Sequence, residues 1–169
     1  MFIVLGWEEY QEGFGEMSGE LWIGLRHIHQ LTSRREYRLR VELEDWDGRW
    51  FHAEYDTFSI ADETDNYRLR VDGYHGNAGD SLAYHDSMPF STLDRNNDNN
   101  SGICATWCRG AWWYKDCFES NLNGQYHDSG PYTTHTGWGD GMVWKHIKNT
   151  NYYSLKSSIM KIMPKNPEH

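Results

Sequence analysis

The sequence has few basic residues, no long apolar run and only three cysteines. Each shortage argues against one class of protein. Lysine and arginine number 16 against 25 acidic residues, which gives a net charge of -9. Nucleic-acid binding depends on neutralising phosphates, so nucleic acid is excluded as a partner. No apolar run approaches the ~18 residues of a membrane span. The opening Met1–Leu5 lacks the basic start and the apolar length of a signal peptide, so we expect any export signal to lie upstream.

The small number of cysteines leaves the cellular compartment open. Cys104 and Cys117 enclose a short loop, and a disulfide between them would stabilise the fold by about 3 kcal/mol by restricting the unfolded chain. Cys108 would then remain unpaired. Three free buried thiols in a reducing compartment fit the same count.

What the sequence has in plenty is aromatic residues. The 169 residues suit one domain, and they include nine tryptophans and eleven tyrosines in an apolar fraction of only 38%. Side chains with polar tips therefore replace aliphatic bulk, which favours a domain rich in binding surface.

The first half of the chain carries regular patterns. Leu25, Ile28 and Leu31 lie at helical spacing and predict a short helix. Apolar and charged residues then alternate in Tyr37–Leu43 and Tyr67–Val71, which predicts half-solvated antiparallel strands.

Two further elements follow from local signals. Asp47-Gly48 predicts a hairpin turn leading into a strand over Trp50–Tyr55. A closing strand is predicted over Tyr153–Met163, ending before Pro164. Between about Asp72 and Gly141 the periodicity fades while Gly, Asn, Asp and Trp accumulate, which indicates a long ordered segment of loops with a functional role.

Several segments resemble the fibrinogen-like domains of fibrinogen chains, ficolins, tachylectins, angiopoietins and fibroleukin-type proteins. They occur in the family's order, which makes the set far more specific than any single motif. The segments are Trp7–Tyr10 with Gly13–Gly15, Glu20–Gly24, Gly79–Leu82, Phe90–Arg95, Gly110–Tyr114, Ser120–Gly124, and Tyr153–Lys156 with Met160–Ile162.

The resemblance implies an α+β fold with a twisted antiparallel sheet, short helices and a loop-rich subdomain that binds calcium and ligand. It implies a single partial domain over 1–169, with a sheet and helix core at about 7–72 plus 142–164 and the loop-rich subdomain at about 73–141. Family members begin with a disulfide-bridged subdomain and a Gly-rich strand, which would lie before Phe2. We therefore expect an N-terminally truncated domain with a sheet edge or a core face left uncovered.

The run from Asp94 to Gly102 offers carboxylate, amide and backbone oxygens, which suit calcium. The resemblance places a calcium site here, formed by the side chains of Asn96 and Asp98 and the carbonyls of Asn100 and Gly102. Asn96 stands where the family usually has Asp, so we expect weakened affinity. A polar turn held by Asx hydrogen bonds is the alternative.

The resemblance also pairs Cys104 with Cys117 in a disulfide. In many relatives the peptide bond before the second cysteine is cis, here Asp116–Cys117, and such strain turns backbone N–H groups toward an acetyl carbonyl or a carboxylate. The expected ligand-binding residues are Cys108, Asp116, Cys117, Phe118, Tyr126 and Trp138, with Tyr152 as a further candidate. We interpret Trp112, Trp113 and Trp144 as core residues and Trp138, between two glycines, as exposed.

These observations leave two binding functions and one catalytic alternative. The first is a secreted innate-immune lectin that binds acetylated glycans with calcium support. The second is a receptor-binding or fibrinogen-type protein-interaction domain, because one fold serves all these uses. Fibrinogen-like proteins often form oligomers through segments that precede the domain. Glycoside hydrolysis would need a carboxylate pair such as Glu8-Glu9, Asp45 with Asp47, or Asp62-Glu63. These segments are amphipathic or turn-like, so we expect no enzyme activity.

Overall fold

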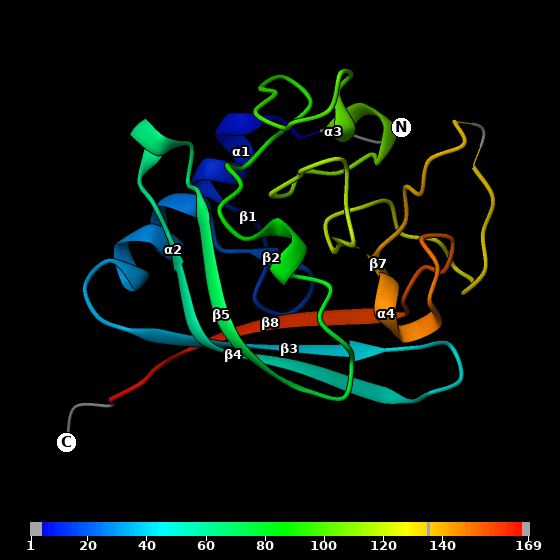
Figure 1. Ribbon diagram of the computed structural model, residues 1–169, viewed down its shortest axis with the longest axis horizontal. Coiled ribbons are helices and arrows are strands. Elements are labelled where there is room, and N and C mark those ends of the chain that lie inside the picture. The colour runs from blue at the N-terminus through cyan, green and yellow to red at the C-terminus, as the bar shows by residue number, and fades with distance from the viewer. Residues whose placement is uncertain (1–4, 135, 167–169) are drawn as a thin grey trace.

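A four-stranded antiparallel sheet of order β5-β4-β3-β8 forms the base of the molecule in the computed structural model, which describes residues 5–134 and 136–166. Its strands are β3 (Tyr37–Glu44), β4 (Trp50–Ile60), β5 (Leu69–Gly76) and β8 (Ser157–Pro164). In β3, buried residues alternate with more exposed ones, so one face of the sheet packs inward and the other meets water. Figure 1 shows the sheet at the bottom of the view, with the loop-rich segments above it.

The remaining elements are short and lie on the inner side of this sheet. The N-terminal ones are α1 (Trp7–Glu12), β1 (Phe14–Gly15), β2 (Leu21–Trp22) and α2 (Leu25–Thr32). The later ones are η1 (Glu63–Asp65), η2 (Ala83–His85), α3 (Cys104–Trp107), β6 (Ser120–Asn121), β7 (Val143–Trp144) and α4 (Lys145–Lys148). Two small antiparallel pairs, β1-β2 and β6-β7, complete the α+β architecture.

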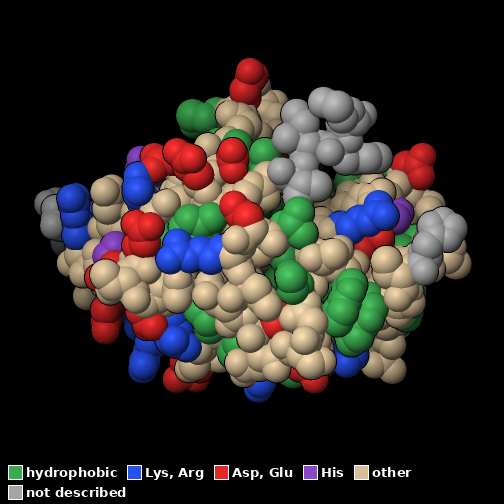
Figure 2. Space-filling view, turned by 90° about the horizontal axis from the view of Figure 1, so that it is seen from above, with side chains coloured by type: hydrophobic (Ala, Val, Ile, Leu, Met, Phe, Trp, Pro, Cys, Tyr) green, Lys and Arg blue, Asp and Glu red, His purple; other side chains and the backbone are tan. Residues whose placement is uncertain are grey.

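Large aromatic side chains occupy the centre of the core. Trp112, Trp113 and Tyr114 have no exposed surface and Trp144 is 2% exposed, which confirms that these tryptophans are structural. They lie with Leu39, Val41 and Leu43 of β3 in one hydrophobic cluster that joins the loop-rich segments to the sheet. Figure 2, which views the loop side, shows small groups of hydrophobic side chains between polar and charged surface.

Most patterned segments form the predicted elements. The helix at Leu25, the strand from Tyr37 and the turn at Asp47-Gly48 are confirmed. The prediction for β8 was wrong at both ends, because Tyr153 instead forms an isolated bridge with Pro131, and the strand continues through Pro164 opposite Tyr37. Proline is tolerated there because β8 is an edge strand, where a missing N–H breaks no ladder on the open side.

Candidate functional site

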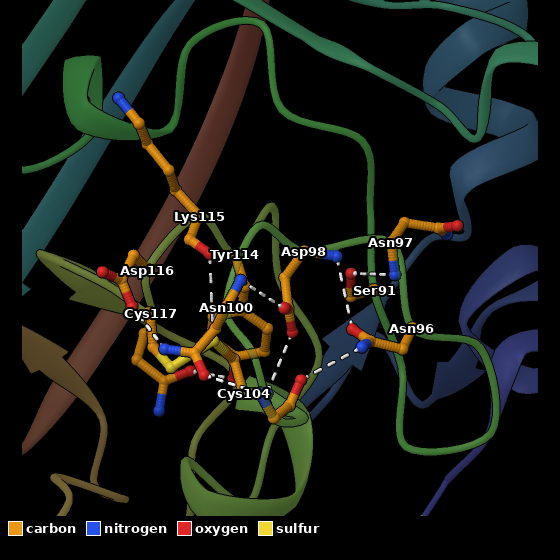
Figure 3. Close-up of a disulfide and its surroundings, with 12 residues drawn as sticks. Ser91, Asn96, Asn97, Asp98, Asn100, Cys104, Tyr114, Lys115, Asp116 and Cys117 are labelled. Carbon is orange, nitrogen blue, oxygen red and sulfur yellow. Dashed lines mark hydrogen bonds between the residues drawn. A yellow bond between two sulfur atoms is a disulfide. The ribbon is translucent and has the colours of Figure 1, made fainter.

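The loop between β5 and α3 turns around the carboxylate of Asp98. Its Oδ1 accepts a hydrogen bond from Asn100 N at 2.9 Å, and its Oδ2 accepts one from Cys104 N at 2.9 Å (Figure 3). Asn100 Oδ1 accepts from Gly102 N at 2.8 Å. Asn96 Oδ1 accepts from Asp98 N at 3.3 Å, and its Nδ2 donates to Gly102 O at 3.2 Å. The structure thus brings all four residues expected at the calcium site into one turn.

Asp98 contributes the one carboxylate among the four residues expected to bind calcium. Burial raises the pKa of Asp98 and repulsion from Asp116 adds to this rise, against the opposing effect of its two backbone N–H donors. Among the described residues no Lys, Arg or His forms an ion pair with Asp98, and no three His, Cys, Asp or Glu side chains cluster in metal-binding geometry. A site here would therefore have one carboxylate completed by amide and carbonyl oxygens, as Ca²⁺ accepts. The Asn96 amide would have to turn its oxygen toward the metal.

The predicted disulfide between Cys104 and Cys117 is confirmed, with the two Cα atoms 5.4 Å apart. It joins α3 to the segment that follows the buried tryptophans. A second link lies beside it, since Asn100 Nδ2 donates to the carboxylate of Asp116. The oxygen-lined turn and the cysteine segment are therefore joined by the disulfide, by this side-chain hydrogen bond and by a backbone hydrogen bond from Asn99 N to Lys115 O at 3.0 Å.

The expected cis peptide bond between Asp116 and Cys117 is absent, because the described residues contain no cis peptide bond. The trans form of a non-proline bond is favoured by about 3 kcal/mol. The turn is closed instead by Lys115 N, which donates to Cys117 O at 2.9 Å.

A pocket of about 230 Å³ opens next to this disulfide. Its lining consists of Asp116, Cys117, Phe118, Gly137, Trp138, Gly139, Asn151 and Tyr152. Four of the six expected ligand-binding residues therefore meet in one place, together with Tyr152. The other two do not line it. Cys108 has no exposed surface, and Tyr126 lies beside Trp46, with ring centroids 6.3 Å apart.

Cys108 is unsuited to contact a ligand or to react. It is the free cysteine of the chain, and burial raises the pKa of its thiol to about 12. A buried, protonated thiol acts as a small hydrophobic side chain. A disulfide from Cys108 to another chain would require an accessible sulfur and does not fit this burial.

Three residues that line the pocket carry hydrogen-bonding groups without a partner among the described residues. The backbone N–H groups of Cys117 and Phe118 donate to none of those residues, whereas the next two, Glu119 and Ser120, donate to His85 Nε2. Asn151 Oδ1 is buried and also has no partner within the described chain. Buried polar groups are normally satisfied, so such exceptions beside a pocket indicate where a ligand's polar atoms would bind.

Trp107 connects the oxygen-lined turn to the pocket. Its indole stacks on that of Trp138, with ring centroids 5.1 Å apart and an interplanar angle of 12°. The six-membered ring of Trp107 lies against Gly102, where an added Cβ would stand 2.1 Å from Cη2. Trp138 itself is 38% exposed, which confirms the prediction that it reaches the surface.

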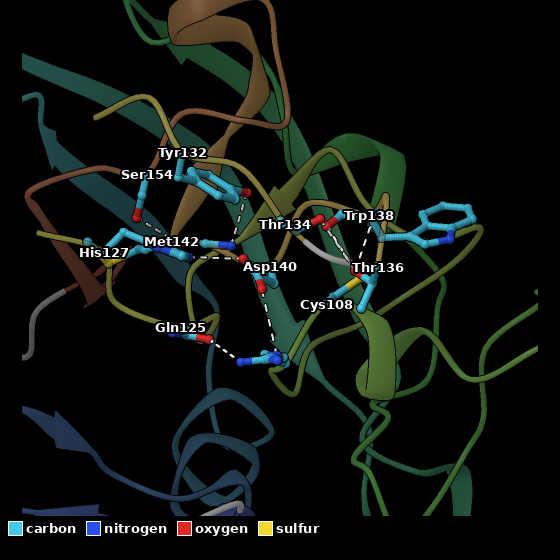
Figure 4. Close-up of polar contacts among 12 residues, drawn as sticks. Cys108, Gln125, His127, Tyr132, Thr134, Thr136, Trp138, Asp140, Met142 and Ser154 are labelled. Carbon is cyan, nitrogen blue, oxygen red and sulfur yellow. Dashed lines mark hydrogen bonds and ion pairs between the residues drawn. The ribbon is translucent and has the colours of Figure 1, made fainter. Parts of the chain in front are cut away.

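A polar cluster around Asp140, drawn in Figure 4, includes Tyr132, which contacts the pocket-lining residue Asn151. The buried carboxylate of Asp140 contacts His127 Nε2 at 2.9 Å and Arg109 Nε at 3.7 Å. Tyr132 stacks on His127 with ring centroids 4.3 Å apart, and its hydroxyl donates to Asn151 O at 2.5 Å. The motifs of the sequence did not mark Asn151, because a single polar residue in a loop carries no periodic signal.

The family model for the C-terminal globular domain of fibrinogen beta and gamma chains matches residues 3–165. The chain belongs to the fibrinogen C-terminal domain family. This fibrinogen-like domain is 49% identical to human angiopoietin-related protein 6 over 158 residues, which cover 94% of this chain and 33% of that protein. It is 46% identical to mouse fibrinogen C domain-containing protein 1 over 164 residues, which cover 94% of this chain and 35% of that protein. The chain thus spans about a third of the length of these relatives.

Solved structures show that the fold of this fibrinogen-like domain is shared. The fibrinogen-like globe domain of human ANGPTL6 superposes with a TM-score of 0.92 at 48% identity, covering 96% of this chain and 72% of that one. Lamprey fibrin D-dimer, complexed with the peptide ligand Gly-His-Arg-Pro-amide, superposes with a TM-score of 0.91 at 34% identity, covering 98% of this chain and 58% of that one. Within the described residues, no helix has the length and apolarity needed to cross a bilayer.

Proposed function

We propose that this fibrinogen-like domain is an extracellular recognition module that binds acetylated glycans in the pocket beside the disulfide, as an innate-immune lectin would, with calcium supporting the pocket. The observation that carries the proposal is that Cys117 and Phe118, whose backbone N–H groups have no partner among the described residues, line a cavity of about 230 Å³ together with aromatic side chains. An extracellular setting agrees with a structural disulfide.

An acetamido group matches the chemistry of this pocket at both ends. Its carbonyl oxygen would accept from the two backbone N–H groups, and its N–H would donate to the unpartnered Asn151 Oδ1. Its methyl group would contact the rings of Phe118, Trp138 and Tyr152, which line the same cavity. An ammonium group in place of the acetamide would offer the two N–H groups no acceptor.

Calcium would be held by the carboxylate of Asp98, the amide oxygen of Asn96 and the carbonyls of Asn100 and Gly102. It would supply the positive charge that the half-buried Asp98 lacks among its described neighbours. Calcium binding would affect the pocket by two routes. Asn100 forms a hydrogen bond with Asp116, which lines the pocket. Gly102 packs against Trp107, which stacks on the pocket residue Trp138. One carboxylate in the ligand set implies modest affinity.

The test is retention of the purified domain on resin coupled to N-acetylglucosamine, compared with resin coupled to glucosamine. We expect calcium-dependent retention on the acetylated resin alone. Trp138→Ala should abolish retention, whereas Tyr126→Ala, which removes an exposed aromatic ring outside the pocket, should not. Equal retention on both resins would rule out acetyl recognition.

The second candidate is a protein-interaction domain that binds a receptor or peptide. It is favoured by the likeness to lamprey fibrin, whose structure holds a peptide ligand, and by the angiopoietin-related protein. Against fibrin-like assembly, the family resemblance implies that Cys108, Phe118 and Gly139 replace the groups with which fibrinogen receives an amino-terminal peptide. Titration with Gly-His-Arg-Pro-amide tests the peptide-binding form of this candidate, because the acetyl site predicts no binding of a free amino terminus.

We infer no catalytic activity for the domain. Glu8-Glu9 and Asp62-Glu63 are exposed and lie outside the pocket. Asp45 is buried and pairs with Lys148 at 2.9 Å, so it is a structural carboxylate.

A further inference from the structure

The oxygen-lined turn around Asp98 contains a sequence that can direct a covalent modification. Asn99-Asn100-Ser101 has the pattern Asn-x-Ser, in which x is any residue except proline. It is the one Asn-x-Ser or Asn-x-Thr sequence in the 169 residues. Such a sequence accepts an N-linked glycan where its asparagine lies on the surface of an exported protein. Whether Asn99 can serve depends on the contacts of its side chain.

Four asparagines lie in this turn, and three of them use their amide nitrogen to hold it together. Asn96 Nδ2 donates to a backbone carbonyl at 3.2 Å, and Asn97 Nδ2 donates to another at 2.8 Å. Asn100 Nδ2 donates to the carboxylate of Asp116. Figure 3 shows these side chains around the disulfide. A sugar attached to any of the three nitrogens would crowd an acceptor that closes the turn.

Asn99 differs from the other three asparagines. Its Nδ2 contacts the sulfur of Met88 at 3.8 Å, and a thioether is only a weak acceptor. This nitrogen has no other acceptor within residues 5–134 and 136–166, and Asn99 is exposed. The asparagine that the modification signal selects is therefore the one whose amide nitrogen does not support the turn.

The backbone of Asn99 is fixed although its side chain is free. Its N–H donates to Lys115 O at 3.0 Å. The neighbouring side chains of Asp98 and Asn100 turn inward, because they accept hydrogen bonds from the backbone N–H groups of Asn100 and Gly102, respectively. The side chain of Asn99 takes no part in these bonds. A sugar attached to it would replace none of the oxygens expected to bind calcium.

Ser101, the third residue of the signal, is also exposed. The signal requires its hydroxyl, yet this hydroxyl forms no hydrogen bond within the part of the chain that the structure describes. Because the fold makes no use of the hydroxyl, a substitution at Ser101 changes the signal and leaves the contacts of the turn in place.

We propose that Asn99 carries an N-linked oligosaccharide, which stands outside the oxygen-lined turn and leaves its contacts intact. The donor is an oligosaccharide linked to a lipid pyrophosphate. A bond forms between Asn99 Nδ2 and the anomeric carbon, the bond from that carbon to the phosphate oxygen breaks, and the lipid pyrophosphate leaves with the electron pair. The displaced amide proton passes to a base of the transferase. The proposal rests on the extracellular setting of the proposed function, because this transfer takes place in the secretory pathway.

The experiment expresses the 169-residue chain behind a cleavable signal peptide in cultured mammalian cells and examines both lysate and medium. Peptide N-glycosidase F removes N-linked sugars and converts the acceptor asparagine to aspartate. We expect the enzyme to increase the electrophoretic mobility of the chain, and we expect mass spectrometry to locate the new aspartate at position 99. Ser101→Ala should abolish the shift, whereas Ser101→Thr keeps the signal at the same exposed position and should retain it. Absence of a shift in both fractions overturns the proposal.

A count of free thiols tests whether the glycan leaves the turn intact. The denatured but unreduced chain should have one free thiol, that of Cys108, because Cys104 and Cys117 are paired. We expect the same count in the glycosylated chain and in Asn99→Gln. A higher count in the glycosylated chain would show that the sugar opens the cysteine segment, which contradicts the second half of the proposal.

The glycan and the acetyl pocket fail independently of each other. Retention of Asn99→Gln on the acetylated resin tests the pocket in a chain without the glycan. The mobility shift tests the glycan without reference to any ligand. A chain that shows the shift but no retention keeps this site and loses the acetyl pocket, and the opposite pair of results keeps the pocket and overturns this site.

Discussion

Gly102→Ala tests whether the oxygen-lined turn and the pocket are mechanically connected. A Cβ at this position would stand 2.1 Å from Cη2 and 2.4 Å from Cζ2 of Trp107. The backbone of Gly102 does not have the positive φ that disfavours alanine. The effect of the substitution is therefore steric and acts on one side chain.

The expected cost follows from how far Trp107 must move. Ordinary contact begins near 3.4 Å, so the ring has to shift by about 1.3 Å away from the turn. Overpacking of this kind costs about 1–3 kcal/mol, and loss of the stack on Trp138 costs about 0.5–1.5 kcal/mol. We expect the free energy of unfolding to fall by about 2 kcal/mol and the affinity for an acetylated sugar to fall about tenfold, which corresponds to about 1.4 kcal/mol.

Denaturant unfolding and sugar titration measure these two quantities. Gly19→Ala is the matched control, because an added Cβ there meets no atom within 4 Å. In a Trp107→Ala background, Gly102→Ala should cost almost nothing, since the ring that it displaces is gone. Equal cost in both backgrounds, or unchanged sugar affinity in a folded Gly102→Ala protein, would refute the connection.

Three further predictions concern the surroundings of the site. Burial lowers the pKa of His85 to about 4, so below its ordinary pKa of 6.5 the unfolded chain binds a proton that the folded chain does not bind. The free energy of unfolding should therefore fall by about 3 kcal/mol between pH 6.5 and 4. Urea melts across this range should show a much flatter pH profile for His85→Gln. Replacing Cys104 and Cys117 together by serine should lower the free energy of unfolding by about 3 kcal/mol, and a loss below 1 kcal/mol in denaturant melts would contradict the bracing role of the disulfide. Asn96→Asp should raise calcium affinity at least tenfold and Asp98→Asn should abolish calcium binding, as measured by calorimetry, and the reverse order would exclude this turn as the calcium site.

Patterned and motif-bearing parts of the chain could be predicted from the sequence. Leu39 and Val41 alternate with charged residues, and this alternation alone fixes which face of β3 is buried. The Cys104–Cys117 pair followed from the resemblance, because motifs on both sides of it keep the family's order.

The rest depends on tertiary packing that leaves no local signal. Tyr126 was expected at the pocket, yet it lies beside Trp46, because nothing in its neighbouring residues indicates which way the loop turns. Asn151 was missed for the same reason, since Tyr132 positions it through a single hydrogen bond from a distant loop. The position of β8 beside β3, at the end of the strand order, became identifiable only from the structure.

The most direct test of the account is the affinity of the domain for N-acetylglucosamine with saturating calcium and with chelator. If the turn around Asp98 and the pocket brace each other, calcium should tighten sugar binding at least fivefold, and the sugar should tighten calcium binding by the same factor. If calcium binds while the affinity for the sugar stays the same, the two sites are independent and the central claim is wrong.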